Sequence, residues 1–358
     1  MGPLAGVRII ELAALGPAPF CGMLLADLGA EVILIERPGE GDGLSAGILR
    51  RGKRSVTLDL KNAEDIALLK RMAADADALI EGMRPGVLER LGLGPQVLHA
   101  LNPRLVIGRM TGWGQSGPLA HTAGHDNNYI ARSGALWYAG AEDQPPQAPP
   151  TLVGDLGGGA MYLAVGLLAA LHHARASGQG QVVDAAIVDG SAHLMNLLLD
   201  MNAAGSGQEA RGQSLLDGPH WYASYRCADG RDLTVGALEA KFYRELLTRL
   251  GLADDPDFAS QHARAHWPAQ KAKLAQLFAS QPRAHWQALL DGSDACAAPI
   301  HSPSEAARDP HLAARAAYFE RDGHLEGAPA PRFSATPGAA GPIPQPGQDS
   351  AHYRHKYA

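Results

Sequence analysis

The sequence predicts an α/β protein: a Rossmann-like large domain with a parallel sheet, together with a smaller α+β domain. The first observation is a βαβ pattern near the start, where an apolar run over 7–12 precedes an amphipathic stretch and a second apolar run over 31–35. The second is that strand-like and helix-like stretches keep alternating as far as Met110. The third is Asp229-Gly230 between two strand-like runs, which is typical of an antiparallel hairpin.

The elements of the large domain follow from their periodicity and turn residues. Gly16 and Pro17 separate the first strand from its helix, and Gly29 ends that helix. The turn after the first strand lacks the G-x-G-x-x-G pattern, so the dinucleotide fingerprint is missing. We expect strands at 7–12, 31–35, 54–59, 78–81, 105–110 and 181–187, and helices at 18–28, 63–74, 87–90, 95–102, 159–174 and 190–204.

The later part of the chain has a different pattern. A polar, glycine-rich stretch over 206–218 marks a domain boundary. Beyond it we expect hairpin strands at 222–227 and 231–235, a helix at 239–250, several short helices as far as about Leu290 and a helical stretch at 305–320. The tail over 327–348 is rich in Pro and Gly, which predicts an extended arm.

Composition narrows the class of protein. The chain has 358 residues, of which 46% are hydrophobic and 19% charged, enough for two globular domains. A net charge of -6 argues against a nucleic-acid partner. Three widely spaced cysteines suggest neither a disulfide framework nor a metal site, so we expect a reducing, cytoplasmic location. We also expect no signal peptide and no membrane span, because the longest apolar stretch, 160–171, is short.

Two segments supply groups suited to proton transfer. His125 lies in the segment 124–129, and Asp155 lies in the glycine-rich segment 154–159. An enzyme that removes a proton from one face of a carbon and returns it to the other face needs two such groups. Asp155 also stands where an apolar helix is expected to begin, and helix N–H groups stabilise a charged oxygen. Two alternatives stay open: Asp155 as a helix N-cap, and His125 as a structural residue.

Basic residues gather at the expected strand ends. Arg37 follows the second strand, a basic cluster spans 50–54, and Arg84 and Arg90 follow the fourth strand. Guanidinium groups pair bidentately with phosphate, so these positions suit a phosphate-rich ligand. The alternative for any one of these segments is a solvated basic face.

Taken together, several segments resemble the class III CoA-transferase superfamily and, within it, the branch of α-methylacyl-CoA racemases. The resemblance runs over nearly the whole chain, and the joint match is specific although no single segment would be. The segments are GVRIIEL (6–12), ERP (36–38), RSVTLDLK (54–61), RPGVLERLG (84–92), TGWGQSGP (111–118), AGHD (123–126), GD (154–155) and VGALE (235–239).

The resemblance implies a large α/β domain built from both chain ends and a small central domain. We expect residues 1–190 and 320–358 in the large, CoA-binding domain, 191–220 as a linker, 221–305 in the small domain and 306–319 as a return linker helix. The resemblance also implies an interlocked homodimer, with the active site where domains of the two subunits meet.

The resemblance also assigns roles to residues. His125 and Asp155 match the acid/base positions, and Glu239 and Asp126 match neighbours that orient or polarise them. Racemases share the Asp with the transferases, but the Gly-His-Asp and Gly-Ala-Leu-Glu segments set them apart, and this chain has both. The implied CoA-thioester contacts are Arg37, Leu58, Asp59, Leu60, Lys61, Gly82, Met83, Arg84, Arg90, Gly124, Asn127, Asn128 and Tyr129.

The chain departs from the family pattern at two positions. Asn127 stands where an apolar residue is expected, and Met83 where an aromatic one is expected, so the acyl preference is open. The apolar stretch 194–201 contains two methionines, whose thioether chains would provide an adaptable acyl surface. Core packing is the alternative for this stretch.

These observations predict a cofactor-independent racemase that interconverts the epimers of 2-methylacyl-CoA thioesters, with the CoA thioester as substrate. We expect the enolate oxygen to contact N–H groups at the helix start after Asp155. One alternative is a CoA-transferase in which Asp155 is the nucleophile and forms an acyl-aspartyl intermediate. A second alternative is a non-catalytic acyl-CoA-binding protein. The missing glycine fingerprint argues against a nicotinamide dehydrogenase.

Overall fold

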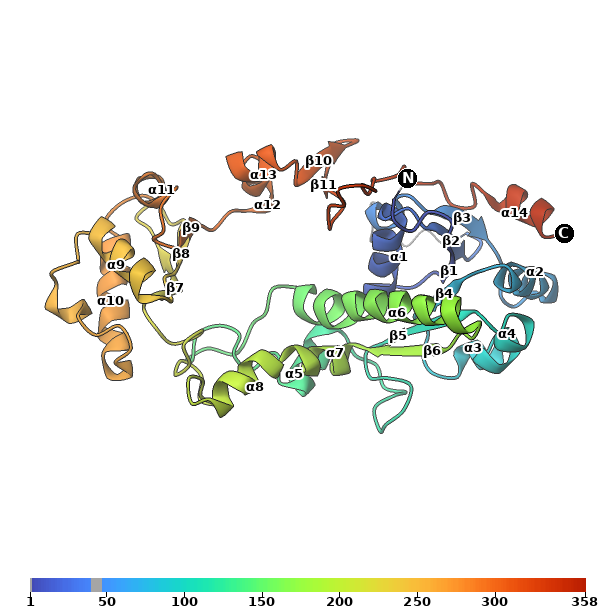
Figure 1. Cartoon of the computed structure of the whole chain (residues 1–358), viewed down its shortest axis with the longest axis horizontal. Coiled ribbons are helices and arrows are strands. Elements are labelled where there is room, and N and C mark those ends of the chain that lie inside the picture. Colours follow the sequence, from blue (N-terminus) through green and yellow to red (C-terminus); the bar gives the residue numbers. More distant parts are fainter. Residues whose placement is uncertain (1, 40–46) are drawn as a thin grey trace. The chain divides into compact units, whose positions relative to one another are not determined.

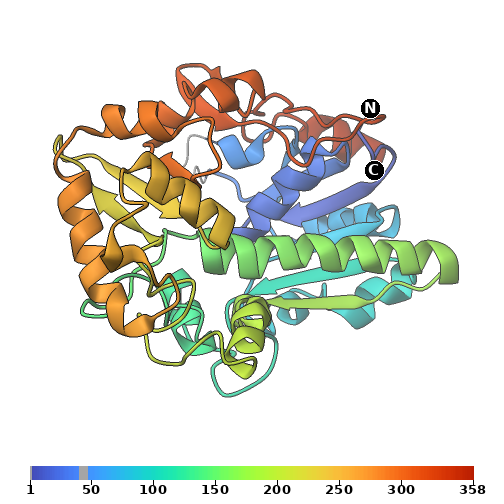
Figure 2. The same ribbon diagram turned by 60° about the vertical axis from the view of Figure 1, so that its left-hand side comes forward.

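The computed structural model describes residues 2–39 and 47–358 of the chain, which form two compact units (Figures 1 and 2). The first unit comprises Met1–Leu136, Ala148–Met195 and Ala316–Ala358, and the second comprises Trp137–Gln147 and Asn196–Arg315. The first unit is therefore assembled from three separate stretches of chain. The segment 137–147 belongs to the second unit because it forms hydrogen bonds with residues of that unit. Trp137 Nε1 donates to the Glu209 carbonyl at 2.7 Å, and the Ala139 carbonyl accepts from Arg211 at 3.2 Å.

The first unit is built on a six-stranded sheet in which every paired strand is parallel. The strand order is β3-β2-β1-β4-β5-β6, the arrangement of a doubly wound Rossmann-like sheet, so the predicted fold class is confirmed. The strands are β1 Arg8–Leu12, β2 Glu31–Glu36, β3 Arg54–Thr57, β4 Ala78–Glu81, β5 Val106–Thr111 and β6 Val182–Ala186.

Helices cover both faces of this sheet, because successive side chains of a strand point to opposite faces. Ile9 of β1 packs in one core with α1 and α6, whereas Ile10 packs in the other with α2, α4 and α14. Both isoleucines are completely buried. The helices of this unit are α1 Pro17–Asp27, α2 Ala63–Ala74, α3 Val87–Arg90, α4 Pro95–Leu101, α5 Asp126–Ser133, α6 Met161–Ser177, α7 Ile187–Leu194 and α14 Ser350–Lys356, with a short 3-10 turn at Ile48–Arg50 (Figure 1).

Three helical features of the chain differ from the sequence prediction. A π-helical segment, η2 (Leu152–Ala160), precedes α6 and continues into it, so the helix begins before Asp155 and not at Gly159. In place of the single helix expected over 190–204 there are two: α7 in the first unit and α8 (Asn196–Ala203) in the second. Helix α14 follows the tail predicted over 327–348, at residues for which no helix was expected.

The joined helix Leu152–Ser177 is the one helix among the described residues that is long and apolar enough to cross a membrane, by length and composition alone. This helix is longer than the apolar stretch 160–171 because η2 adds its residues to those of α6. Helix α6 packs against β5 and β6 of the sheet, and Leu163 and Leu167 are completely buried there. These contacts account for the apolar character of its inner face.

The second unit has the α+β composition that the sequence predicts. Its antiparallel sheet has the order β7-β8-β9, and β7 and β8 form the hairpin around Asp229-Gly230. Trp221, Phe258 and Phe278 are the largest fully buried side chains of its core. The elements are β7 Tyr222–Arg226, β8 Asp232–Gly236, β9 Ala297–Pro299, α9 Ala240–Arg249, α10 Trp267–Phe278, α11 Arg283–Leu290, α12 Pro303–Ala306 and α13 Pro310–Ala314, with short 3-10 turns at Pro256–Phe258 and Arg264–His266.

The helix expected over 305–320 does not form. Two short helices, α12 and α13, stand there, and the strand β10 (Tyr318–Arg321) follows and pairs with β11 (His324–Gly327) in the first unit. Pro310 interrupts the helical pattern, because proline cannot donate the main-chain hydrogen bond that a helix interior requires. The return linker expected at 306–319 is therefore not a single helix.

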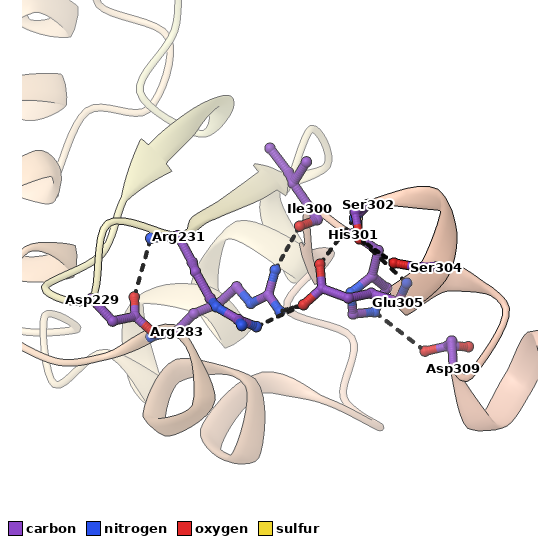
Figure 3. Close-up of polar contacts among 9 residues, drawn as sticks. All are labelled: Asp229, Arg231, Arg283, Ile300, His301, Ser302, Ser304, Glu305 and Asp309. Carbon is purple, nitrogen blue, oxygen red and sulfur yellow. Dashed lines mark hydrogen bonds and ion pairs between the residues drawn. The ribbon is translucent and has the colours of Figure 1, made fainter.

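An ion-pair cluster holds the returning chain against the second unit (Figure 3). The Glu305 carboxylate pairs with Arg231 at 2.6 Å and with Arg283 at 2.7 Å, and Arg283 also donates to the Ile300 carbonyl at 2.6 Å. The Ser302 N–H bonds to Glu305, and with Arg283 it lowers the pKa of Glu305 to about 2. Glu305 is therefore ionised at neutral pH and serves as an anchor of this segment.

We predict that Gly190→Ala destabilises the protein. An ideal Cβ on Gly190 would lie 1.9 Å from the carbonyl oxygen of Gly158, so α7 and η2 would have to move apart. Overpacking of this kind costs about 1–3 kcal/mol. The midpoint of urea unfolding should fall accordingly. Gly327→Ala is the matched control, because a Cβ there meets no atom within 4 Å; equal midpoints for the two variants would contradict the prediction.

Candidate active site

The positions predicted to bind CoA follow the carboxyl ends of three neighbouring strands. Arg37 follows β2, Leu58 follows β3 and Gly82 follows β4. Because the strands are parallel, their carboxyl ends share one edge of the sheet, which is where ligands bind in open α/β folds. The strand order reverses between β1 and β4. The chain segments that follow these two strands lie close together, because a Cβ built on Gly82 would stand 2.8 Å from the Cβ of Ala14.

Asp155 lies inside the π-helical segment η2, so its interpretation as an N-cap is wrong. Its main-chain N–H donates to the Asp126 carboxylate Oδ1 at 2.8 Å. A Cβ built on Gly16, in the turn after β1, would lie 3.4 Å from Asp155 Oδ2. The Asp155 carboxylate therefore faces the β1–α1 turn. Short π-helical insertions of this kind occur frequently at functional sites.

His125 and Asp126 stand at the start of helix α5, which the sequence pattern did not predict. His125 is the N-cap residue, its side chain is exposed, and its N–H donates to Asn128 Oδ1 at 3.0 Å. Asp126 is the first helical residue and is buried, with 8% of its surface exposed. One short stretch thus provides an exposed imidazole and, beside it, the buried carboxylate that binds the Asp155 main chain.

A glycine permits α5 and η2 to approach so closely. An ideal Cβ on Gly154 would lie 2.4 Å from Asp126 Oδ1 and 2.8 Å from a side-chain carbon of Ile130. Any side chain at this position would break the contact between the two helices. The glycine before Asp155 is therefore needed to bring Asp126, and with it His125, next to Asp155.

The three groups interact electrostatically. Partial burial and, next, the nearby Asp126 carboxylate raise the pKa of Asp155, a positive charge on His125 lowers it, and together they give a pKa of about 6. A carboxyl group with this pKa can be both protonated and ionised near neutral pH. That property suits a group that donates a proton in one direction of a reaction and accepts one in the other.

The oxyanion donors expected after Asp155 are already bonded. The Leu156 N–H donates to the Thr151 carbonyl at 3.0 Å, and the Met161 N–H caps the segment by donating to the Leu156 carbonyl. The π-helical pattern uses the N–H groups between them as well. The expectation is therefore wrong for this stretch. At the start of α5, in contrast, Asp126 and Asn127 are the first two helical residues, whose N–H groups have no acceptor within their own helix.

The residues predicted to contact CoA differ in how far they are exposed. Leu58 is completely buried, so only its main chain can reach a ligand, and the Tyr129 ring is buried against Trp113. The Tyr129 hydroxyl donates to the Gly124 carbonyl. Leu60, Met83 and Gly124 are half-buried, and the exposed positions are Arg37, Asp59, Lys61, Gly82, Arg84, Arg90, Asn127 and Asn128.

Most of the basic cluster at 50–54 is structural. Lys53 is buried and pairs with Glu11 at 2.6 Å, and Arg51 is buried between Asp27 at 2.5 Å and Glu326 at 2.9 Å. Arg50 pairs with Glu36 at 2.8 Å. These side chains fasten β1, α1 and the β10–β11 hairpin, so they are not the phosphate contacts that the sequence cluster suggested.

The remaining predicted site residue, Glu239, belongs to the second unit. It is the exposed N-cap residue of α9, and Ala237 and Leu238 separate it from the end of β8. Gly16 is a residue that sequence reasoning used only as a turn signal, although the structure places it against Asp155. Only its position directly after the first strand of a βαβ unit could have suggested this.

Comparison with known proteins places this geometry in a family. Residues 4–350 match the model of CoA-transferase family III. The chain belongs to this family. It is 43% identical to a mouse protein named alpha-methylacyl-CoA racemase, over 93% of this chain and 87% of that one. It is 37% identical to succinyl-CoA–D-citramalate CoA-transferase of Chloroflexus aurantiacus, over 94% and 89% of the two chains.

A solved structure of a CAIB/BAIF family protein from Brucella suis shares the fold of this family III chain. The TM-score is 0.86 at 27% identity, and each chain is covered completely. The predicted resemblance to class III CoA-transferases is thereby confirmed. The roles of the individual site residues stay predictions.

We predict that Asp155 makes folding stability depend on pH. Its pKa in the folded protein, about 6, is raised from 3.8, so its protonated form stabilises the fold below about pH 4, and this contribution is lost as the pH rises through 6. The free energy of unfolding of the neutral variant Asp155→Asn, relative to that of the wild type, should therefore increase by on the order of 1–2 kcal/mol from pH 4 to pH 7.5. Urea unfolding at the two pH values measures this difference.

The exposed carboxylate Asp143 provides the control. Asp143→Asn changes the net charge by the same amount and should keep a constant stability difference from wild type. An Asp155→Asn difference that is flat over this pH range would mean that Asp155 has an ordinary pKa.

Proposed function

We propose that this protein is a racemase that interconverts the (R)- and (S)-epimers of 2-methylacyl-CoA thioesters by a two-base 1,1-proton transfer. The observation that carries the proposal is the joint presence of His125 and Asp155, brought together through the Asp126–Asp155 hydrogen bond. The 43% identity to the mouse racemase, over 93% of the chain, supports it. The enzyme is accordingly an isomerase.

In the proposed mechanism, His125 and Asp155 act on opposite faces of the α-carbon. Neutral His125 removes the α-proton from one epimer, and protonated Asp155 delivers a proton to the other face of the enolate. For the second epimer the roles reverse. The raised pKa of Asp155 favours this, because the group must be protonated in one direction and ionised in the other.

The thioester oxygen becomes negative in the enolate and needs donors. We place it at the N-terminus of α5, where the N–H groups of Asp126 and Asn127 have no acceptor within the helix. Loss of one such donor typically costs about 100- to 1000-fold in rate. Asp126 would then have two roles: its carboxylate orients Asp155, and its main-chain N–H is one of the donors at the start of α5.

The CoA part of the substrate provides binding energy away from the reacting carbon. Arg37, Arg84 and Arg90 are the exposed cations after β2 and β4 that suit its phosphates. Arg84 also lies near Tyr129. Burial and the Asp155 charge raise the pKa of Tyr129, and the Arg84 charge offsets part of this increase. CoA is part of the substrate in this proposal, and the residues themselves supply the proton transfer without a cofactor. Glu239 is assigned as a polarising neighbour from the family resemblance.

A CoA-transferase is the second candidate, because the Chloroflexus aurantiacus relative at 37% identity carries that name. In that chemistry the Asp155 carboxylate attacks the thioester carbonyl, the C–S bond breaks and CoA leaves as the thiolate. A transferase does not require His125 as a proton acceptor, so the His–Asp pair favours the racemase. A binding protein without turnover would need neither group.

We further propose that the protein is a cytoplasmic homodimer. Its first unit exposes large apolar side chains on α6 and on the edge strand β6: Val165 is 63% exposed, Met161 44% and Val182 39%. Apolar surface of this kind is typical of an interface. In sedimentation experiments at micromolar concentration the wild-type protein should have twice the chain mass, and Val165→Glu should shift it toward the monomer; an active wild-type monomer would contradict this proposal.

We predict that single substitutions split racemisation into half-reactions. In heavy water, His125→Ala should abolish interconversion yet still exchange the α-proton of the epimer whose hydrogen faces Asp155. Asp155→Ala should show the mirror behaviour with the other epimer. Mass spectrometry of pure 2-methylacyl-CoA epimers measures deuterium uptake, and chiral chromatography measures optical purity.

Hydroxylamine provides the opposing test. A nucleophilic Asp155 would form an acyl-aspartyl mixed anhydride as CoA leaves. Hydroxylamine attack on the Asp155 carbonyl of this anhydride would release the free carboxylate, leave Asp155 as a hydroxamate and so inactivate the enzyme. Such inactivation of the wild type, with acyl transfer to a free acid and no deuterium uptake, would replace the racemase by the transferase.

A further inference from the structure

The outer edge of the parallel sheet is closed by the C-terminal segment, and not by another strand. β3 is one of the two edge strands. Its Ser55 N–H donates to Asp349 Oδ2 at 2.9 Å, and the Ser55 carbonyl accepts the Asp349 N–H at 2.8 Å. The Thr57 N–H donates to Ser350 Oγ at 2.9 Å. The start of α14 thus satisfies the polar groups that an edge strand leaves open.

The same segment reaches the chain after β3 through an ion pair. Arg354 of α14 pairs with Asp65 Oδ1 at 2.7 Å and donates to the Thr57 carbonyl at 3.3 Å. The other oxygen of Asp65 accepts the N–H of Asp59 at 2.8 Å. Asp65 is buried, with 7% of its surface exposed, whereas the Arg354 side chain is 47% exposed, so the bridge links a surface cation to a buried carboxylate.

Asp59 determines the shape of the residues that follow it. Its carboxylate accepts the Lys61 N–H at 2.9 Å, and its carbonyl accepts the Asn62 N–H at 2.8 Å. Burial raises the pKa of Asp65, but the hydrogen bonds from Arg354 and from Asp59 outweigh burial and lower it. The Asp65 carboxylate is therefore ionised and able to bond on both sides at neutral pH.

We propose that Arg354 is a positioning residue for the CoA loop, defined as residues 58–61. Through Asp65 it fixes the Asp59 main chain, and with it the loop conformation that contacts the CoA thioester. The inference rests on the proposed function, which places CoA contacts at these four residues. Arg354 keeps its proton at all relevant pH values, so it affects binding and not the proton transfer.

The test uses the full-length protein and Arg354→Ala. The amide hydrogens of the CoA loop should exchange about tenfold faster or more, because the bridge to Asp59 is lost. The Kd of CoA itself, measured by calorimetry, should rise about tenfold, as expected when a charge-assisted contact is removed. The KM for a 2-methylacyl-CoA should rise with it while kcat stays unchanged. Arg354→Lys, which keeps the charge, should show smaller changes in amide exchange, Kd and KM than Arg354→Ala.

Arg71→Ala is the matched control, because Arg71 also holds α14, by donating to the Tyr357 carbonyl, but does not bond to Asp65. Equal effects of Arg71→Ala and Arg354→Ala would overturn the inference in favour of a general loosening of the tail. Unchanged amide exchange in the CoA loop of Arg354→Ala would overturn it as well. So would faster exchange with an unchanged Kd.

Arg84→Ala separates the inference from the proposed function. If Arg84→Ala leaves the Kd of CoA unchanged while Arg354→Ala raises it, the assigned phosphate contact is wrong but the positioning role of Arg354 is supported. If Arg84→Ala weakens CoA binding and Arg354→Ala does not, the proposed CoA site is supported and the positioning role is wrong.

Discussion

The site depends on one contact, the docking of α5 against the π-helical segment η2. Asp126 Oδ1 accepts the Asp155 N–H at 2.8 Å, and Gly154 leaves no room for any side chain between the two elements. This contact fixes where the Asp155 carboxylate lies and, because His125 precedes Asp126 directly, where the imidazole lies as well. It also keeps two carboxylates close together, which is one cause of the raised pKa of Asp155. Position and protonation therefore have the same origin.

The rest of the first unit holds this contact in place through a close approach of main chains. Gly158 of η2 meets Gly190 of α7, and Gly16 after β1 lies against Asp155. A π-helical segment is wider than an α-helix and less regular, so it needs neighbours that prevent its relaxation. Both neighbours begin at carboxyl ends of the parallel sheet, β1 and β6. The sheet thus orients the proposed acid/base pair although neither residue belongs to a strand.

The sequence was sufficient for the fold of the first unit because its signals are local. Alternating apolar strands and helices with glycine or proline between them predict the six strands to within a residue or two. The sequence was insufficient where partners far apart in the chain decide whether a side chain is structural or free to bind a ligand. Arg51 and Lys53 look like a ligand-binding cluster in the sequence, yet their partners Asp27, Glu326 and Glu11 are distant along the chain and bury them. Helix α5 has too short an apolar pattern to predict, and a π-helix has no signal in residue type.

Asp155 is the proposed reactive group in both candidate chemistries, and its surroundings favour one of them. A nucleophilic carboxylate must be ionised when it attacks, so a raised pKa lowers its reactive fraction at a given pH. A proton carrier must pass through both states, so the same raised pKa brings the two states closer in energy. Burial and the Asp126 charge raise the pKa of Asp155, while a proton on His125 would lower it again. A proton that arrives on His125 therefore favours the ionised form of Asp155, which is the alternation in protonation that the proposed two-base mechanism requires.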